Sequence, residues 1–94
     1  MQEETKEPLK VDTMLRVFIG ELILKAWAWL GVTSHPENNR MQTDLKQAKL
    51  AIDSLEKLLE LKNDFLTEDE IKEIEFSLSN LKLNYVSKVN EKNT

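Results

Sequence analysis

Cysteine is absent from this 94-residue sequence, and glycine and proline occur only twice each. Without cysteine the chain can form neither a disulfide nor a thiolate zinc site, which favours a reducing, cytoplasmic location. Both glycines and both prolines lie before residue 37, so the rest of the chain has no strong helix breaker. The fold must be stabilised by packing, and a chain this short buries only about 60–65% of its unfolded surface.

An excess of positive charge is also absent. The formal net charge of -4 opposes binding to nucleic acid, whose phosphates require clustered Lys and Arg. The first ten residues are polar and acidic, so we expect no secretory signal. The apolar run that follows contains Arg16, Glu21 and Lys25. Each charge costs about 2.5–3.5 kcal/mol in a bilayer and each apolar residue gains only about 0.3–0.6 kcal/mol, so we expect no stable membrane insertion.

The spacing of apolar residues predicts an all-α fold with three helices, over about residues 12–31, 43–63 and 67–89. Gly31 is the residue type favoured just after a helix C-terminus. Thr43 or Asp44 begins the second helix, and Thr67 with Glu70 forms a capping box at the start of the third. We expect polar, flexible tails at residues 1–10 and 90–94, which flank one helical domain over residues 11–89.

The second and third helices each carry one apolar stripe with spacings of three and four residues, which predicts the core. At 1.5 Å per residue, helices of about twenty residues are about 30 Å long. They can lie side by side as antiparallel neighbours, in a three-helix bundle or an array of helical hairpins. The stripes are Leu45, Ala48, Ile52, Leu55 and Leu59, followed by Ile71, Ile74, Leu78, Leu81 and Tyr85.

The first helix carries two apolar faces on nearly opposite sides. We expect one face to be core; it consists of Leu15, Phe18, Leu22, Ala26 and Trp29. The other consists of Thr13, Val17, Gly20, Leu24 and Trp27. A glycine inside a helix costs about 1 kcal/mol relative to alanine, and this cost is easiest to justify where another backbone comes close.

Smaller second facets occur on the other helices, at Leu50 and Leu61 and at Phe76 and Leu83. An exposed, contiguous apolar patch usually marks a contact with another molecule. We therefore predict that homo-oligomerisation, as a dimer or higher assembly, completes the fold through the first helix. A different protein partner, or a merely half-exposed Trp27, is the weaker hypothesis. The predicted contact residues are Val17, Gly20, Leu24 and Trp27.

The sequence shows no catalytic constellation. His35 is the single histidine and lies beside Ser34 in a polar loop, but sequence neighbours rarely align as nucleophile and base. We interpret it as a loop histidine without a catalytic role. The acids at the start of the third helix offset the positive end of its dipole and lack the ligand pattern of a calcium loop. We predict a non-enzymatic protein with no metal and no cofactor.

Two alternatives remain open at this point. In the first, the chain is a small-molecule-binding or enzymatic module with a pocket between helices or subunits, lined by Trp29 and Tyr85 with His35 at its mouth. In the second, the first helix attaches to a membrane surface. That helix lacks the lysine-rich polar face that interfacial helices usually carry, which weakens the second alternative.

Several short motifs recur in a fixed order along the chain. They are "VD" at residues 11–12, "A...LG" at 26–31, Pro36, "DL..A...ID.L..L" at 44–58, "LT..E" at 66–70 and "L..L.L.YV" at 78–86. In order and spacing the chain resembles the small bacterial family catalogued as domain of unknown function 1844. The stretches "ELILKA" and "LKNDFLT" depart from that family's pattern. The resemblance implies a small cytoplasmic protein of unassigned function and supplies no catalytic residues.

Overall fold

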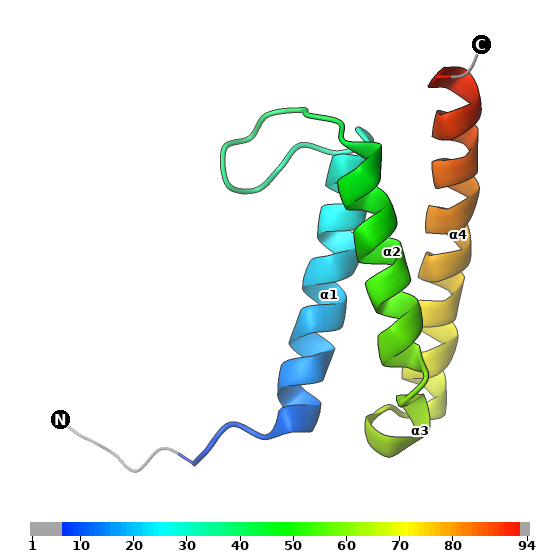
Figure 1. Ribbon diagram of the computed structural model, residues 1–94. Helices are drawn as coiled ribbons and strands as arrows, with labels where there is room; N and C mark the ends of the chain where they lie inside the picture. Colours follow the sequence, from blue (N-terminus) through cyan, green and yellow to red (C-terminus); the bar gives the residue numbers. More distant parts are fainter. Residues whose placement is uncertain (1–6, 93–94) are drawn as a thin grey trace, which may run out of the picture.

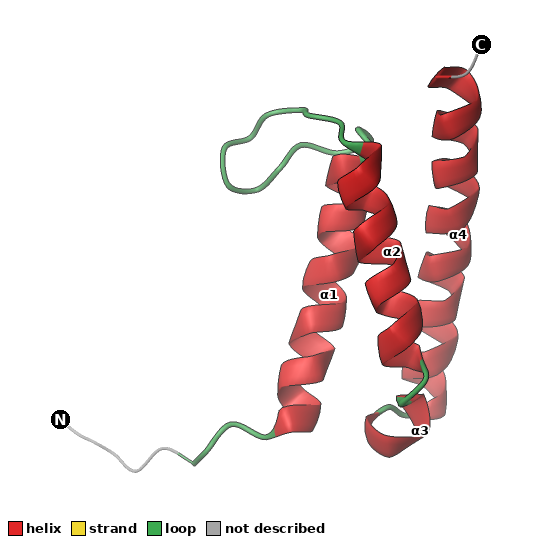
Figure 2. Cartoon of the chain, in the orientation of Figure 1, coloured by secondary structure: helices red, strands yellow, loops and turns green. Residues whose placement is uncertain are grey.

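The computed structural model describes residues 7–92. It contains helices α1 (Val11–Trp29), α2 (Leu45–Leu59), α3 (Lys62–Phe65) and α4 (Glu68–Lys92). Only loops connect them, and the described residues contain no strand (Figure 2). The chain rises through α1, returns through α2 and rises again through α4 (Figure 1). The predicted all-helical class, with three main helices packed together, is confirmed.

Helix α2 lies between the two other long helices. It packs against α1 on one side and against α4 on the other, whereas α1 and α4 have few contacts with each other. The narrowest extent of the molecule is 18 Å, less than twice the diameter of about 10–12 Å of a helix with its side chains. The core is therefore thin, and its largest fully buried side chains are Leu30, Leu55 and Leu81.

The stripes predicted for the second and third helices form most of this core. Ala48, Ile52, Leu55 and Leu59 are buried on α2, and Leu45 packs against them from the first turn. On α4 the buried members are Leu78 and Leu81, with Ile74 and Tyr85 packed alongside. A spacing of three and four residues thus identified the buried faces of both helices.

The predicted helix starts are confirmed by side-chain caps. Asp44 Oδ1 accepts hydrogen bonds from the backbone N–H groups of Lys46 and Gln47, at 3.1 and 3.2 Å. Thr67 Oγ1 accepts from the Glu70 backbone N–H at 3.2 Å, and the Glu70 carboxylate accepts from the Thr67 N–H at 2.9 Å. These bonds satisfy N–H groups that the first helical turn leaves without partners.

Gly31 ends α1 in the way its residue type predicts. Its φ is +82°, and the Val32 and Gly31 N–H groups donate to the carbonyls of Trp27 and Ala28 at 3.1 and 2.9 Å, which is the Schellman pattern. A Cβ at Gly31 would also collide with the Thr43 side chain. The glycine is therefore required both by its backbone conformation and by a close approach.

Three helix ends differ by two to four residues from the approximate bounds predicted. The first helix ends at Trp29 rather than residue 31, and α2 ends at Leu59 rather than continuing to residue 63. After α2, the N–H groups of Glu60 and Leu61 bond three residues back, which tightens the chain into a 3₁₀ turn and leads into α3. Helix α4 continues to Lys92 because nothing breaks it, so the tail predicted from residue 90 is helical as far as 92. Residues 1–6 and 93–94 lie outside the described residues.

One core assignment on α1 is wrong. Phe18 was expected inside but is 48% exposed, whereas Ile19 is only 3% exposed. The buried face of α1 is the side that α2 covers. Its centre is formed by Ile19, Ala26 and Leu30. Leu15, Leu22 and Trp29 pack at the edge of this face, so the predicted face is displaced around the helix rather than reversed.

The α2 core predicts a large loss of stability when Leu55 is truncated. Leu55 is fully buried, so Leu55→Ala should lower the free energy of unfolding by about 2–5 kcal/mol through lost burial and the remaining cavity. Leu50 is the matched control, because it is 59% exposed on the same helix and its truncation should cost no more than about 0.5 kcal/mol. Urea denaturation measures both, and equal midpoints would contradict the packing described.

Candidate interaction surface

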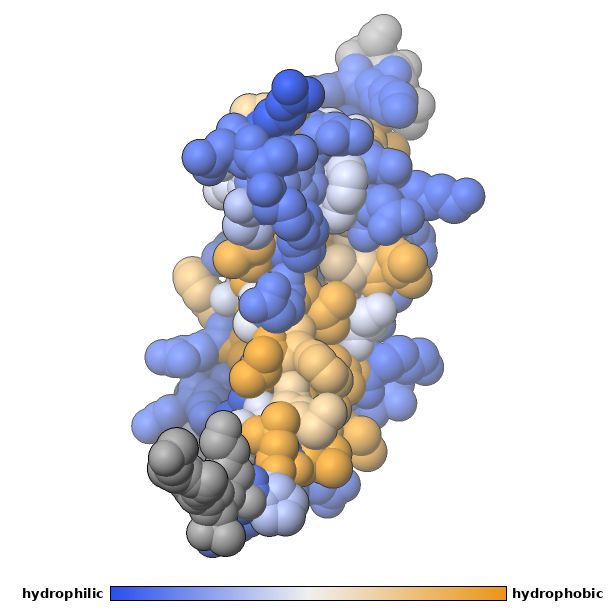
Figure 3. Space-filling view, turned by 90° about the vertical axis from the view of Figure 1, so that its left-hand side faces the viewer, coloured by the Kyte–Doolittle hydropathy of each residue, from blue (hydrophilic) through white to orange (hydrophobic). Residues whose placement is uncertain are grey.

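The outer face of α1 consists of Thr13, Val17, Gly20, Leu24 and Trp27. Val17 is 56% exposed and Leu24 43%, and Thr13 and Gly20 are also exposed. Figure 3, which looks onto the α1 side of the molecule, shows apolar atoms gathered over its middle and lower part. Large apolar side chains therefore remain in water on a helix that also contributes to the core.

Trp27 and Trp29 are both half-buried and pack against the core. Trp29 was expected to be a core residue, and its ring also meets the His35 ring edge-on at 4.1 Å between centroids. Trp27 was expected to lie on the contact face. It lines the hollow beside Gly20 and Leu24 on that face and also packs partly against the core.

Two hollows adjoin the outer face, and both are lined by Gly20 and Ile23. One extends toward the start of α4 and the other toward the loop between α1 and α2. We call their union the outer groove. Its α4 end is lined by Arg16, Ile19, Leu66, Glu70, Glu73 and Ile74, and its loop end by Leu24, Trp27, Thr33, Ser34, Pro36 and Asn39.

Gly20 lies where the two ends of the outer groove meet. A Cβ built at this position meets no atom within 4 Å, so packing inside the single chain does not require a glycine. A glycine in a helix still lowers the stability by about 1 kcal/mol relative to alanine. The space above it leaves room for the close approach of another backbone.

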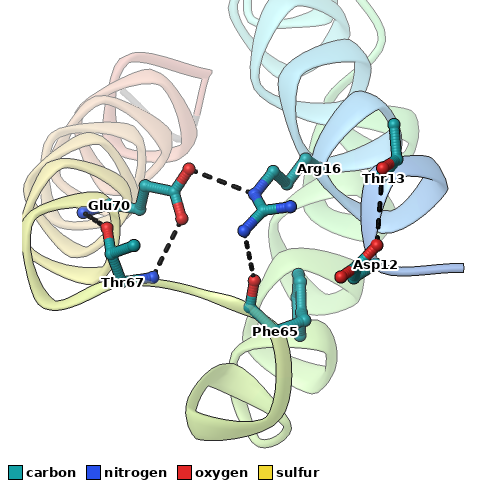
Figure 4. Close-up of polar contacts among 6 residues, drawn as sticks. All are labelled: Asp12, Thr13, Arg16, Phe65, Thr67 and Glu70. Atoms are coloured by element: carbon teal, nitrogen blue, oxygen red, sulfur yellow. Dashed lines mark hydrogen bonds and ion pairs between the residues drawn. The ribbon is translucent and has the colours of Figure 1, made fainter. Parts of the chain in front are cut away.

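Arg16 joins α1 to the start of α4 at one end of the outer groove (Figure 4). Its Nε donates to the Glu70 carboxylate at 3.1 Å, and its Nη2 donates to the Phe65 carbonyl at 2.7 Å. Glu70 also accepts from the Thr67 N–H as part of the capping box. This hydrogen bond, and then the Arg16 guanidinium, hold the pKa of Glu70 below its usual value of 4.5.

At the other end of the outer groove a polar cluster connects α1 to the loop. Lys25 Nζ lies 2.7 Å from His35 Nδ1 and donates to the Glu37 carboxylate at 2.8 Å. Lys25 lies ten residues before His35, so no short motif indicates this contact. His35 is only 4% exposed, and it is not among the residues that line the two hollows of the outer groove.

Beside the outer groove, Arg16 is paired with Glu70 and Lys25 with Glu37. Apart from the exposed Glu73 carboxylate, the groove offers mainly apolar atoms to a binding partner. Among the described residues, no three His, Cys, Asp or Glu side chains are grouped so that they could hold a metal ion. Within residues 7–92, no helix combines the length and apolar character needed to cross a membrane.

A family model described as domain of unknown function (DUF1844) matches residues 12–87. The chain belongs to this family. The match includes nearly all of α1, α2, α3 and most of α4, which confirms the resemblance indicated by the short sequence motifs. Neither a curated protein nor a solved structure matches the chain.

The description of the DUF1844 family names no activity, so the match contributes no functional residues. The two stretches expected from the sequence to depart from the family's pattern have clear places in the fold. "ELILKA" lies in α1 and supplies Ile23 and Leu24 to the outer groove. "LKNDFLT" forms the turn that includes α3 and carries the carbonyl bound by Arg16.

The lowered pKa of Glu70 predicts an acid-sensitive contribution to stability. A carboxylate whose pKa is depressed by folding stabilises the protein above its unfolded pKa, and this contribution is lost as pH falls through the folded value. The free energy of unfolding should therefore decline below about pH 4.5, and the decline should be smaller in Glu70→Gln. The matched control is Glu73→Gln, an exposed neighbour on the same helix. Parallel urea midpoints for wild type and Glu70→Gln from about pH 6 to pH 3.5 would refute this role.

Proposed function

We propose that this DUF1844 protein is a non-enzymatic helical protein that self-associates through the outer face of α1. The observation that carries the proposal is this apolar face, exposed in the single chain and crossed at Gly20 by an open groove. Self-association is favoured over a foreign partner because a twofold contact uses one patch twice and needs no second complementary surface.

The residues of the outer face support a crossing centred on Gly20. When two antiparallel copies of α1 cross there, residues equally far before and after Gly20 lie opposite each other. Thr13 of one copy then faces Trp27 of the other, and Val17 faces Ile23. A small side chain meets a large one in the first pair, which is the complementarity that close packing requires.

The outer face alone is too small to stabilise a dimer, so the contact must bury further apolar side chains. Fully burying one Val or Leu side chain gains about 1.5–3 kcal/mol, whereas association costs about 4–15 kcal/mol. Val17 and Leu24 are already about half-buried, so they do not suffice alone. Ile23 and Trp27, which line the outer groove beside Gly20, extend the contact toward the area of about 800 Å² per partner typical of stable contacts.

A paired substitution tests the proposal. Val17→Gln with Leu24→Gln changes only exposed positions, so the helices should form while the apolar face is lost. Light scattering should then give the mass of one chain, 10.9 kDa, where the wild type gives a multiple of it at high micromolar concentration. The matched control is Phe76→Gln with Leu83→Gln, two side chains that are each 69% exposed on α4.

The control should assemble like the wild type. A wild-type mass of 10.9 kDa at high micromolar concentration would refute self-association. Dissociation of the α4 control, with assembly of the α1 variant, would move the contact to α4.

Gly20 predicts opposite effects on folding and on assembly. In dilute solution Gly20→Ala should raise the free energy of unfolding by about 0.5–1 kcal/mol, because alanine favours the helix and its Cβ has open space. Gly20→Gln, also a good helix former, should weaken assembly because its side chain fills the crossing point. Circular dichroism melts at low concentration and sedimentation at high concentration separate the two effects. Assembly of Gly20→Gln as tight as that of the wild type would exclude Gly20 from the contact.

A further inference from the structure

The two ring contacts of His35 fit only one protonation state of the imidazole. Nε2 lies 3.0 Å from the Gln42 carbonyl oxygen, and Nδ1 lies 2.7 Å from Lys25 Nζ. A carbonyl can only accept a hydrogen bond and an ammonium can only donate one. Nε2 must therefore carry the hydrogen and Nδ1 the lone pair, so this geometry requires a neutral imidazole.

The same residue organises the loop between α1 and α2, residues 30–44. Its backbone N–H donates to the Arg40 carbonyl at 2.8 Å, and its carbonyl accepts from the Asn39 N–H at 2.8 Å. Its ring packs edge-on against Trp29. Because Thr33, Ser34, Pro36 and Asn39 of this loop line one end of the outer groove, the position of His35 sets the shape of that end.

Two charged side chains face the imidazole, Lys25 from α1 and Glu37 from the loop. Arg40 takes part through its backbone carbonyl. Lys25 donates to both Glu37 carboxylate oxygens, at 2.8 and 3.1 Å. This hydrogen bond holds the pKa of Glu37 below its usual value of 4.5, so Glu37 stays ionised in the range where a histidine ordinarily titrates.

We infer that Lys25 and His35 form a latch that holds the loop against α1 at neutral pH and releases it on acidification. A proton on Nδ1 removes the lone pair that accepts from Lys25 and places a second positive charge beside the ammonium. Glu37 carries a single negative charge and cannot neutralise both cations. The imidazole and the ammonium separate, the loop keeps only its Glu37 ion pair to Lys25, and the wall of the outer groove moves. This inference rests on the ring geometry and does not depend on self-association.

The wild-type chain tests the latch directly, because His35 is its only histidine. Heteronuclear NMR of the full chain, titrated from about pH 7 to pH 5, follows the ring and the backbone amides together. The amides of residues 32–42 should shift and lose protection from hydrogen exchange in step with the His35 ring, while those of α4 stay constant. A ring that titrates while the loop amides stay unchanged would overturn the latch.

Three variants assign the response to the pair. Lys25→Met keeps an apolar stem near Trp29 but removes the ammonium, so the loop should no longer respond to pH. His35→Gln offers an amide N–H to the Gln42 carbonyl and does not titrate, so it should also lose the response. Lys49→Met is the control, because it breaks a comparable ion pair on α2, with 2.7 Å between Lys49 Nζ and Asp53 Oδ2. In this variant the loop should still respond to pH. An undiminished loop response in Lys25→Met would refute the role of that residue, even if His35→Gln misfolds.

Discussion

The architecture depends on one constraint, which is that α2 must pack against two helices longer than itself. Its 15 residues span about 23 Å, whereas the 19 residues of α1 and the 25 of α4 span about 29 and 38 Å. Because α2 lies between them, α1 and α4 contact each other little and neither covers the outer side of the other. Leu55 and the other buried residues of α2 stabilise the whole chain, and the outer face of α1 remains exposed for the same reason.

Two polar contacts compensate for this open arrangement, one at each end of the outer groove. Arg16 connects α1 to the turn before α4, and Lys25 connects it to the loop through His35 and Glu37. The partners of Arg16 lie 49 and 54 residues away and those of Lys25 lie 10 and 12 residues away, so Arg16 fixes the packing of helices and Lys25 fixes the adjoining loop. Ionisable groups therefore position the walls of the outer groove. At the loop end, where His35 lies, the shape of the groove responds to pH.

The sequence predicted what is locally determined and missed what depends on packing direction. Asp44, Thr67 with Glu70, and Gly31 mark helix ends through bonds to nearby backbone, and each was predicted. Phe18 was placed inside because its spacing fits a core stripe, but only the position of α2 decides that Ile19 is buried instead. Of the candidate surface, Val17, Gly20 and Leu24 are exposed as a second apolar face requires, whereas Trp27 lies partly in the core. Lys25 and His35 meet across a loop, and no sequence pattern encodes such a contact.

The central claim is that a second copy covers the face that α2 leaves open on α1. Isotope-filtered NMR on an equal mixture of ¹³C-labelled and unlabelled chains at high micromolar concentration measures this contact directly. The account predicts intermolecular NOEs from the labelled methyl groups of Val17 and Leu24 to protons of α1 in the unlabelled copy, including the Trp27 indole. Intermolecular NOEs confined to the methyl groups of Leu83 on α4, or none at all, would contradict it.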